Sequence, residues 1–132
     1  MKKLLLIFTL LFSTLMFSTP SYGEWTITGE TESGAKYYFE SDKIITDNEF
    51  VYFWELSDYA NEGGYGYLSD VTRVIADCRL IRFKNLQVTN YKGRMGTGKV
   101  TGKGDISNKW IYPNPGTSKE ESILTVCKQN YR

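Results

Sequence analysis

The sequence contains no histidine, the side chain that most often serves as a general base or as a zinc or haem ligand. Its absence excludes a serine–histidine catalytic triad and an HExxH zinc site. The only two cysteines, Cys78 and Cys127, are too far apart to form a CxxC redox motif. We therefore expect a protein that is not an enzyme and that holds no metal or cofactor.

A nucleotide-binding motif is also incomplete. Residues 93–100, GRMGTGKV, approach a phosphate-binding loop, but Val100 occupies the position of the Ser or Thr that would hold magnesium. Gly102 and Gly104 interrupt any helix that could follow. We interpret residues 91–108, which are rich in Gly, Lys and Thr, as a long mobile loop.

The acidic residues do not form a recognisable constellation. Asp47 and Glu49, and then Asp58, Glu62 and Asp70, fall in or beside predicted turns. The spacing of an EF-hand calcium loop is missing, and a glycosidase pair would have to converge in a cleft. We interpret these carboxylates as solvated turn residues.

The apolar run near the N-terminus is shorter than the roughly 20 residues of a comfortable membrane span. Residues 1–23 instead have the features of a signal peptide. They begin with the basic Lys2 and Lys3, continue with an apolar stretch over 4–17, and end in the small-x-small cleavage site Ser21-Tyr22-Gly23. We predict one mature domain, 24–132, exported to the periplasm, the cell surface or the medium, with no membrane span after cleavage. An uncleaved anchor is the alternative. No cysteine lies near the cut to carry a lipid.

In an exported domain, two cysteines are expected to pair. A Cys78–Cys127 disulfide would close a loop of roughly 50 residues, worth about 4 kcal/mol on the loop-entropy model. Two free thiols or an intermolecular bridge are the alternatives.

Charge is polarised along the chain. Without Lys2 and Lys3 the net charge is 14 − 15 = −1. Residues 24–72 carry two basic and eleven acidic side chains, whereas residues 73–109 carry nine basic and two acidic ones. A basic face would favour acidic partners such as sulfated glycans, anionic lipid or acidic proteins. Alternatively, acidic and basic strands pair and neutralise each other.

Alternating apolar and polar residues predict a mainly β domain. The expected strands are 25–28, 35–39, 43–45, 50–56, two long runs at 67–78 and 79–91, and a short one at 110–112. Within 50–56 we assign Phe50, Tyr52, Trp54 and Leu56 to the core. The apolar phase changes between the two long runs, which indicates a bulge near 82–85 or a tight turn at 77–79.

A helix is predicted at the C-terminal end. Ser118 and Glu121 have the spacing of a capping box, and an apolar stripe from Ile123 to Cys127 follows. The fold class is therefore α+β, a sheet of about six strands with one C-terminal helix packed on it and tethered by the disulfide.

Two groups of side chains are candidates for binding a partner. Tyrosines in the Gly-rich segment 57–67 can serve protein recognition, although they can equally cover an end of the sheet. Basic residues of the following loop can bind an anionic partner, or can simply be solvated. The candidates are Tyr59, Tyr65, Tyr67, Lys92, Arg94, Lys99, Lys103 and Lys109. We expect no binding to nucleic acid, because the chain is exported.

Several short segments, in order, resemble the bacterial surface-adhesin protein E family. They are Gly23-Glu24-Trp25, Lys36-Tyr37-Tyr38, WELSDY at 54–59, Asp77-Cys78, Met95, Trp110-Ile111-Tyr112-Pro113 and Val126-Cys127. The resemblance implies a curved antiparallel sheet with a disulfide-held C-terminal helix. It also implies a monomer or homodimer that binds extracellular-matrix or serum proteins or other surface macromolecules. The alternative is a periplasmic or envelope-associated protein that serves an assembly or binds a small ligand, in a pocket lined by Tyr52, Trp54 and Trp110.

Overall fold

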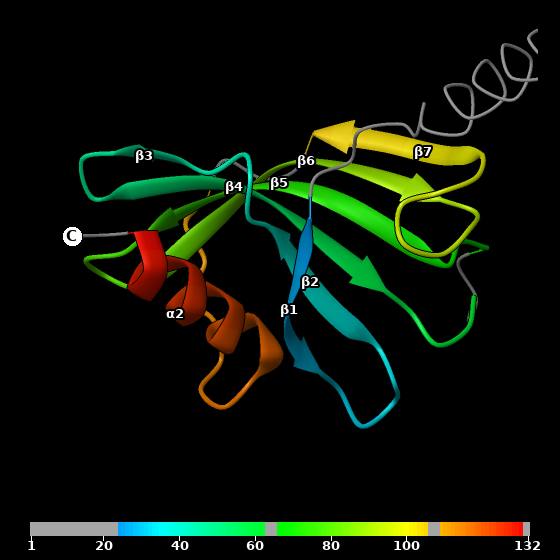
Figure 1. Cartoon of the computed structure of the whole chain (residues 1–132), viewed down its shortest axis with the longest axis horizontal. Coiled ribbons are helices and arrows are strands. Elements are labelled where there is room, and N and C mark those ends of the chain that lie inside the picture. Colours follow the sequence, from blue (N-terminus) through cyan, green and yellow to red (C-terminus); the bar gives the residue numbers. More distant parts are fainter. Residues whose placement is uncertain (1–23, 63–65, 106–108, 131–132) are drawn as a thin grey trace, which may run out of the picture.

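The computed structural model describes residues 24–62, 66–105 and 109–130; the predicted signal peptide, 1–23, lies outside them. The described residues form an open antiparallel sheet of seven strands and one C-terminal helix (Figure 1). The elements are β1 (Trp25–Glu30), β2 (Lys36–Glu40), β3 (Ile45–Asp47), β4 (Phe50–Asp58), β5 (Ser69–Asp77), β6 (Arg82–Tyr91), β7 (Val100–Asp105) and α2 (Ser118–Asn130). The strand order is β1-β2-β4-β5-β6-β7, and β3 pairs with β4 outside this path. The predicted α+β class is confirmed.

The two faces of the sheet differ in what covers them. We call the face on which α2 packs the helix face, and the opposite one the outer face. The core lies between α2 and the helix face. It consists of Phe39, Val51, Phe53, Val74, Ala76, Cys78, Phe83, Ile123, Val126 and Cys127. Because successive side chains of a strand point to opposite faces, residues 51 and 53 fix the orientation of all of β4.

This orientation overturns the predicted core face of β4 for Phe50, Tyr52 and Trp54, whereas Leu56, on the same face, is fully buried as predicted. Val51 and Phe53 are fully buried, whereas Phe50, Tyr52 and Trp54 are half-buried on the outer face. Residues 50–54 are apolar or aromatic at every position, so alternation could not show which set lies inward.

Both features suggested between the two long β runs are present. β5 ends at Asp77 and β6 begins at Arg82, with a turn between them. The β5–β6 register also shifts, since Arg73 pairs with Gln87 but Val74 pairs with Asn85. The turn at 77–79 and a bulge therefore coexist, although the bulge lies beyond Asn85.

The expected mobile loop over 91–108 is wrong where β7 forms. β7 pairs antiparallel with β6 as an edge strand, so backbone hydrogen bonds order a segment with little apolar content. The predicted strand at 110–112 is reduced to an isolated bridge, in which Ile111 and Phe83 exchange backbone hydrogen bonds of 2.8 and 2.9 Å.

The cap of α2 lies one residue earlier than predicted. Thr117 Oγ1 accepts a hydrogen bond from the Glu120 amide at 3.3 Å, and Glu120 Oε1 accepts one from the Gly116 amide at 3.1 Å. Thr117/Glu120 and Ser118/Glu121 have the same spacing, so the sequence offers two equivalent boxes. Ser118 instead packs against Gly29, where an added Cβ would lie 3.2 Å from the Ser118 Cβ.

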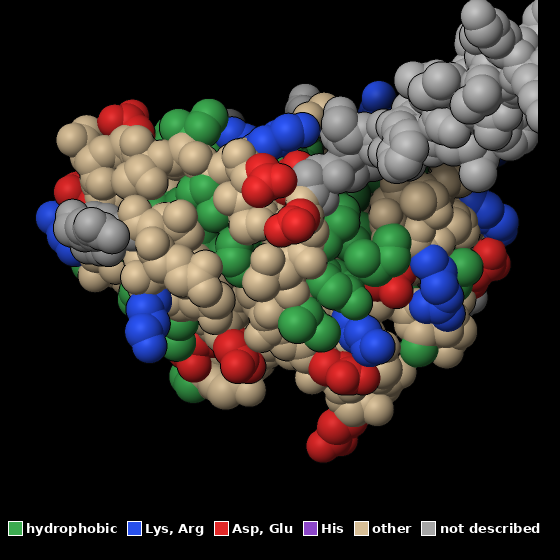
Figure 2. Space-filling model, viewed as in Figure 1, with side chains coloured by type: hydrophobic (Ala, Val, Ile, Leu, Met, Phe, Trp, Pro, Cys, Tyr) green, Lys and Arg blue, Asp and Glu red, His purple; other side chains and the backbone are tan. Residues whose placement is uncertain are grey.

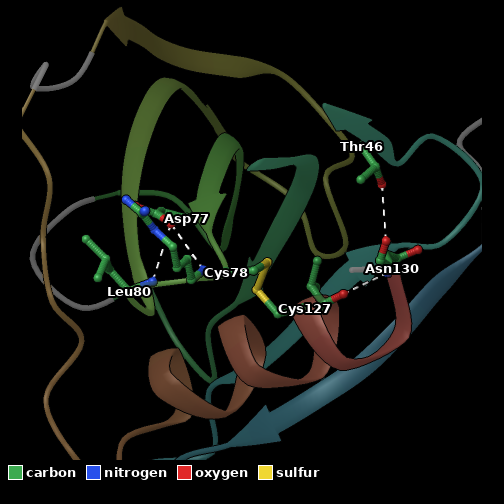
Figure 3. Close-up of a disulfide and its surroundings, with 8 residues drawn as sticks. Thr46, Asp77, Cys78, Leu80, Cys127 and Asn130 are labelled. Carbon is green, nitrogen blue, oxygen red and sulfur yellow. Dashed lines mark hydrogen bonds between the residues drawn. A yellow bond between two sulfur atoms is a disulfide. The ribbon is translucent and has the colours of Figure 1, made fainter. Parts of the chain in front are cut away.

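The predicted Cys78–Cys127 disulfide is confirmed and joins the β5–β6 turn to α2 (Figure 3). The two Cα atoms are 5.5 Å apart, and both residues are buried in the core. The end of the helix is held separately, because Thr46 Oγ1 donates to the Asn130 carbonyl at 3.4 Å. The disulfide thus anchors the C-terminal half of α2 to the sheet.

Candidate functional site

The two segments predicted to bind partners are fastened to each other. Arg94 donates from Nη1 to the Tyr59 carbonyl and from Nη2 to the Ala60 carbonyl, each at 2.8 Å. Its Nη1 also lies 3.5 Å from Asp58 Oδ2. The Arg94 guanidinium therefore links residues 58–60 to the turn that follows β6.

That turn is also held on the ends of β4 and β5. Ser69 Oγ donates to the Gly93 carbonyl at 2.6 Å and accepts from the Gly96 amide at 2.9 Å. The Met95 amide donates to Asp58 Oδ1 at 2.9 Å. Gly96 has φ +68° and lies against the outer face, where an added Cβ would be 3.1 Å from a Val71 methyl group. Residues 93–97 thus form a hydrogen-bonded turn instead of the predicted mobile segment.

The other basic candidates are spread out. Lys92 Nζ lies 3.0 Å from Glu62 Oε1 and donates to the Gly66 carbonyl at 3.3 Å. Lys99 and Lys103 are exposed, and neither forms an ion pair within residues 24–62, 66–105 and 109–130. Lys109 is exposed and precedes Trp110, close to the other end of β6. The structure therefore does not gather these cations into one cluster.

Two of the tyrosine candidates, Tyr59 and Tyr67, lie together at the end of the sheet. The Tyr59 hydroxyl donates to Asp70 Oδ2 at 2.5 Å, and its ring meets Tyr67 edge to face at 5.9 Å between centroids. Burial, followed by the hydrogen bond to Asp70, raises the pKa of Tyr59. Tyr65 lies outside the described residues. A role in partner binding therefore stays a prediction for each of these candidate residues.

A group of cations and aromatic rings on the outer face was not singled out from the sequence. We call it the outer-face cluster, and it consists of Phe50, Tyr52, Trp54, Arg73, Arg82, Lys84 and Trp110. Arg73 on β5 lies over Trp54 and Tyr52 of β4, with its Cζ atom 5.1 and 6.0 Å from the ring centroids. Figure 2 shows hydrophobic side chains at the surface on the side of β1 that lies away from α2.

The second half of the outer-face cluster centres on Trp110. Arg82 Cζ and Lys84 Nζ each lie 4.5 Å from its ring centroid, and Phe50 stacks against it at 5.8 Å. Arg82 is also paired with Asp77 at 2.8 Å. Burial tends to raise the pKa of Asp77, but hydrogen bonds from Arg82 and from the Leu80 and Arg79 amides hold it below its usual value.

Charge is only partly neutralised across the strands. Arg82 has a carboxylate partner, whereas Arg73 and Lys84 form no ion pair with any described residue. Lys103 pairs with Thr89 in the ladder, so it extends the positive charge to the edge strand. Arg73 nevertheless feels the charge of the buried Glu40 carboxylate. The outer face therefore carries two cations without ion pairs beside half-buried rings, which supports the basic-face alternative.

A cavity of about 770 Å³ opens on the helix face. It lies between the strands β2, β4, β5 and β6, the end of β1 with the β1–β2 turn, and the start of α2. Among its lining residues are Tyr37, Glu55, Tyr59, Asp70, Phe83 and Asn85. Tyr52, Trp54 and Trp110, which the alternative reading places around a small-ligand pocket, do not line this cavity, since they lie on the opposite face of the sheet.

The lining of this cavity is rich in hydrogen-bond acceptors. The Glu55 side chain is 6% exposed; its Oε1 lies 2.7 Å from Lys119 Nζ, while its Oε2 has no hydrogen-bond partner. The buried Oδ1 of Asn85 also has none. Burial, more than any other cause, raises the pKa of Asp70, and the Glu55 charge adds to the rise. Burial and then the charges of Glu55 and Asp70 raise the pKa of Tyr37.

None of the helices within the described residues has the length and apolar character needed to cross a membrane.

Comparison with solved structures gives the same fold. Two solved structures of Haemophilus influenzae protein E match. One, its crystal form II, has a TM-score of 0.62 and 15% identity, over 86% of this chain and 94% of that chain. The other has a TM-score of 0.56 and 15% identity, over 84% and 89%. At this identity the likeness shows the fold alone.

No curated protein matches the sequence. The family model of surface-adhesin protein E, however, matches residues 25–128, which is nearly the whole predicted mature domain and includes both cysteines. The chain therefore belongs to the surface-adhesin protein E family.

Proposed function

We propose that this chain is an exported, non-catalytic binding domain that attaches to macromolecules outside the cell through its outer face. Membership of a surface-adhesin family supports a role at or beyond the cell surface. The observation that carries the choice of surface is the pair Arg73 and Lys84, two cations held over aromatic rings without a carboxylate partner among the described residues.

The composition of the outer-face cluster suits a binding surface. Trp, Tyr and Arg are the residues that most often dominate binding energy at protein interfaces. Arg73 and Lys84 already rest on rings, so less side-chain freedom is lost on binding. Ile45, which pairs with Tyr52 and is 57% exposed, adds apolar area beside the cluster.

The charge selects the chemistry of the partner. Unpaired cations favour an anionic macromolecule, such as a sulfated glycan or an acidic patch of an extracellular-matrix or serum protein. Lys103 on β7 and Lys109 beside Trp110 would add positive charge near the cluster, and Lys99 would add it at the other end of β6. Lys92, Arg94, Tyr59 and Tyr67 would act indirectly, by holding the 93–97 turn in place.

The test compares two double variants of the domain 24–132. Arg73→Gln with Lys84→Gln removes the two unpaired cations of the outer face. Lys36→Gln with Lys128→Gln removes two exposed cations from the start of β2 and the end of α2. Binding to immobilised heparin and to a panel of matrix and serum proteins is measured at several salt concentrations.

We expect the outer-face variant to bind about tenfold more weakly, with a smaller dependence on salt, while the control resembles the unmodified domain. Equal binding by both variants would refute the outer-face assignment. Cell fractionation with an antibody against the domain tests export separately, and a cytoplasmic signal would contradict it.

A further inference from the structure

We propose that the helix-face cavity is a binding site for a small organic cation, namely an amine that carries at least one further hydrogen-bond donor. This site is distinct from the outer-face cluster, because Glu55 and Asp70 lie on the face of the sheet that α2 covers. Figure 2 shows acidic side chains along the edge of the molecule where α2 begins and the β1–β2 turn lies.

The first step of the argument is the unused oxygen of Glu55. This side chain is more than nine-tenths buried and lines the cavity. One carboxylate oxygen is satisfied by Lys119, whereas Oε2 has no partner. A buried acceptor without a donor destabilises the folded state, and more strongly so if it is charged. A ligand donor that reached Oε2 would remove this cost.

Lys119 shows what kind of group the site accepts. Its Nζ atom lies 2.7 Å from Glu55 Oε1 and 4.3 Å from the centroid of the Phe83 ring. A primary ammonium group thus already lies between a carboxylate and an aromatic ring at one end of the cavity. The other oxygen of the same carboxylate is an unused acceptor for a group of the same chemistry. Because this oxygen is buried, a ligand reaches it only when the Glu55 side chain turns toward the cavity that it lines.

The remaining charges favour a cation. Four carboxylates line the cavity against one ammonium group; they are those of Glu30, Glu32, Glu55 and Asp70, opposed by Lys119. The start of α2 borders the cavity, but Thr117 caps the Glu120 amide and Glu120 binds the Gly116 amide. The helix N-terminus therefore offers few free amides to an anion, which would in addition meet net negative charge.

A second unused acceptor in the cavity explains why the ligand should carry a further hydrogen-bond donor. Asn85 Oδ1 is buried, lines the same cavity and has no partner. Glu55 is on β4 and Asn85 on β6, with β5 between them, so one ammonium group is poorly placed to serve both. The volume of about 770 Å³ falls in the range of roughly 300–1,000 Å³ that is usual for small-molecule sites. Diamines and amino sugars are the simplest molecules that fit.

The experiment uses nitrogen-15-labelled domain 24–132 and three probes, 1,4-diaminobutane, glucosamine and glucose. Glucose has donors but no charge, so it separates polyol binding from cation binding. Amide shifts are followed during titration of the unmodified domain, of Glu55→Gln, and of Glu49→Gln as a control at the β3–β4 turn. The double variant Glu55→Gln with Lys119→Met guards against misfolding, because neither an unpaired carboxylate nor an unpaired ammonium group remains buried.

We expect at least one amine to shift amides around Glu55, Asp70 and Asn85 and to bind at least tenfold more weakly to both Glu55 variants. The control should bind as the unmodified domain does, and Asn85→Asp should bind more tightly. The absence of amine binding, an unchanged affinity in folded Glu55 variants, or glucose binding as tightly as glucosamine would each overturn the proposal. None of these outcomes bears on heparin binding by the outer face.

Discussion

Lys119, in the first turn of α2, is ion-paired with Glu55 in the middle of β4 at 2.7 Å, and both side chains are largely buried. The start of the helix is thereby fixed to the sheet, as its C-terminal half is fixed by the Cys78–Cys127 disulfide. The two anchors define the part of the helix face that α2 covers and the part that remains open as the cavity.

The anchor at the start of α2 can be tested by removing one partner. Lys119→Met leaves the Glu55 carboxylate buried without a counter-charge, which should lower the free energy of unfolding by about 2–3 kcal/mol, given that Lys119 is partly exposed. Urea unfolding measures the change. The double variant Lys119→Met with Glu55→Gln should recover most of the loss. If it is as unstable as the single variant, the ion pair is not the cause.

The disulfide should contribute more. Its cysteines are 49 residues apart, so replacing both by Ser should lower the free energy of unfolding by about 4 kcal/mol on the loop-entropy model. Partner binding should weaken only to the extent that the domain unfolds. Binding that is lost while the thermal transition stays in place would show that the disulfide has a direct part in recognition.

Arg94 and Lys99 should behave differently although both were predicted to bind partners. Arg94→Ser removes two hydrogen bonds of 2.8 Å to the Tyr59 and Ala60 carbonyls, and should cost about 1–2 kcal/mol of stability because the side chain is half exposed. Lys99→Ser should leave stability unchanged. Equal melting temperatures for the two variants would contradict the structural role of Arg94.

Stability at acid pH should depend on Asp77. Hydrogen bonds from Arg82 and from two backbone amides outweigh burial and hold the pKa of Asp77 below 3.8 in the folded state. A depressed folded pKa stabilises the domain above pH 3.8, and this contribution is lost as pH falls through the folded value. Asp77→Asn should therefore cost about 1–2 kcal/mol at neutral pH and flatten the fall in stability below about pH 4.

Asp70 serves as a control, because its pKa is shifted in the direction opposite to that of Asp77. Its pKa is raised, mainly by burial, so the unmodified domain loses stability as pH rises from the usual carboxyl pKa through the raised value. Asp70→Asn should remove that loss and leave the acid limb due to Asp77. If the two variants change the pH profile of urea unfolding in the same direction, the assignment of the two pKa shifts is wrong.

Local patterns predicted most elements, and the errors have identifiable causes. The C-terminal helix and the strands of the hairpins are predicted by signals within a few residues. The disulfide is predicted because the chain has only two cysteines. The core face of β4 did not, because Tyr52 and Trp54 are large aromatic residues that cores accept as they accept Val51 and Phe53, and only the position of α2 decides between them. β7 was missed because an edge strand rich in Gly and Lys is specified by its pairing with β6 and not by its own composition.

The candidate sites were harder to predict for the same reason. Arg73 reaches Trp54 only because β4 and β5 are neighbours in a particular register. The helix-face cavity needs five strands and the start of α2 together, so no single segment of the sequence carries its signature. The basic residues of 92–109 were conspicuous in the sequence, yet Arg94 is used to hold a turn.

The most direct test of the account is to map where an anionic partner contacts the folded domain. Nitrogen-15-labelled domain 24–132 is titrated with a defined heparin fragment, and amide shifts are assigned along β4, β5 and β6. The account predicts that the largest shifts surround Arg73, Lys84 and Trp110, and that they vanish in Arg73→Gln with Lys84→Gln. Shifts confined to the helix face, or no binding at low salt, would contradict it.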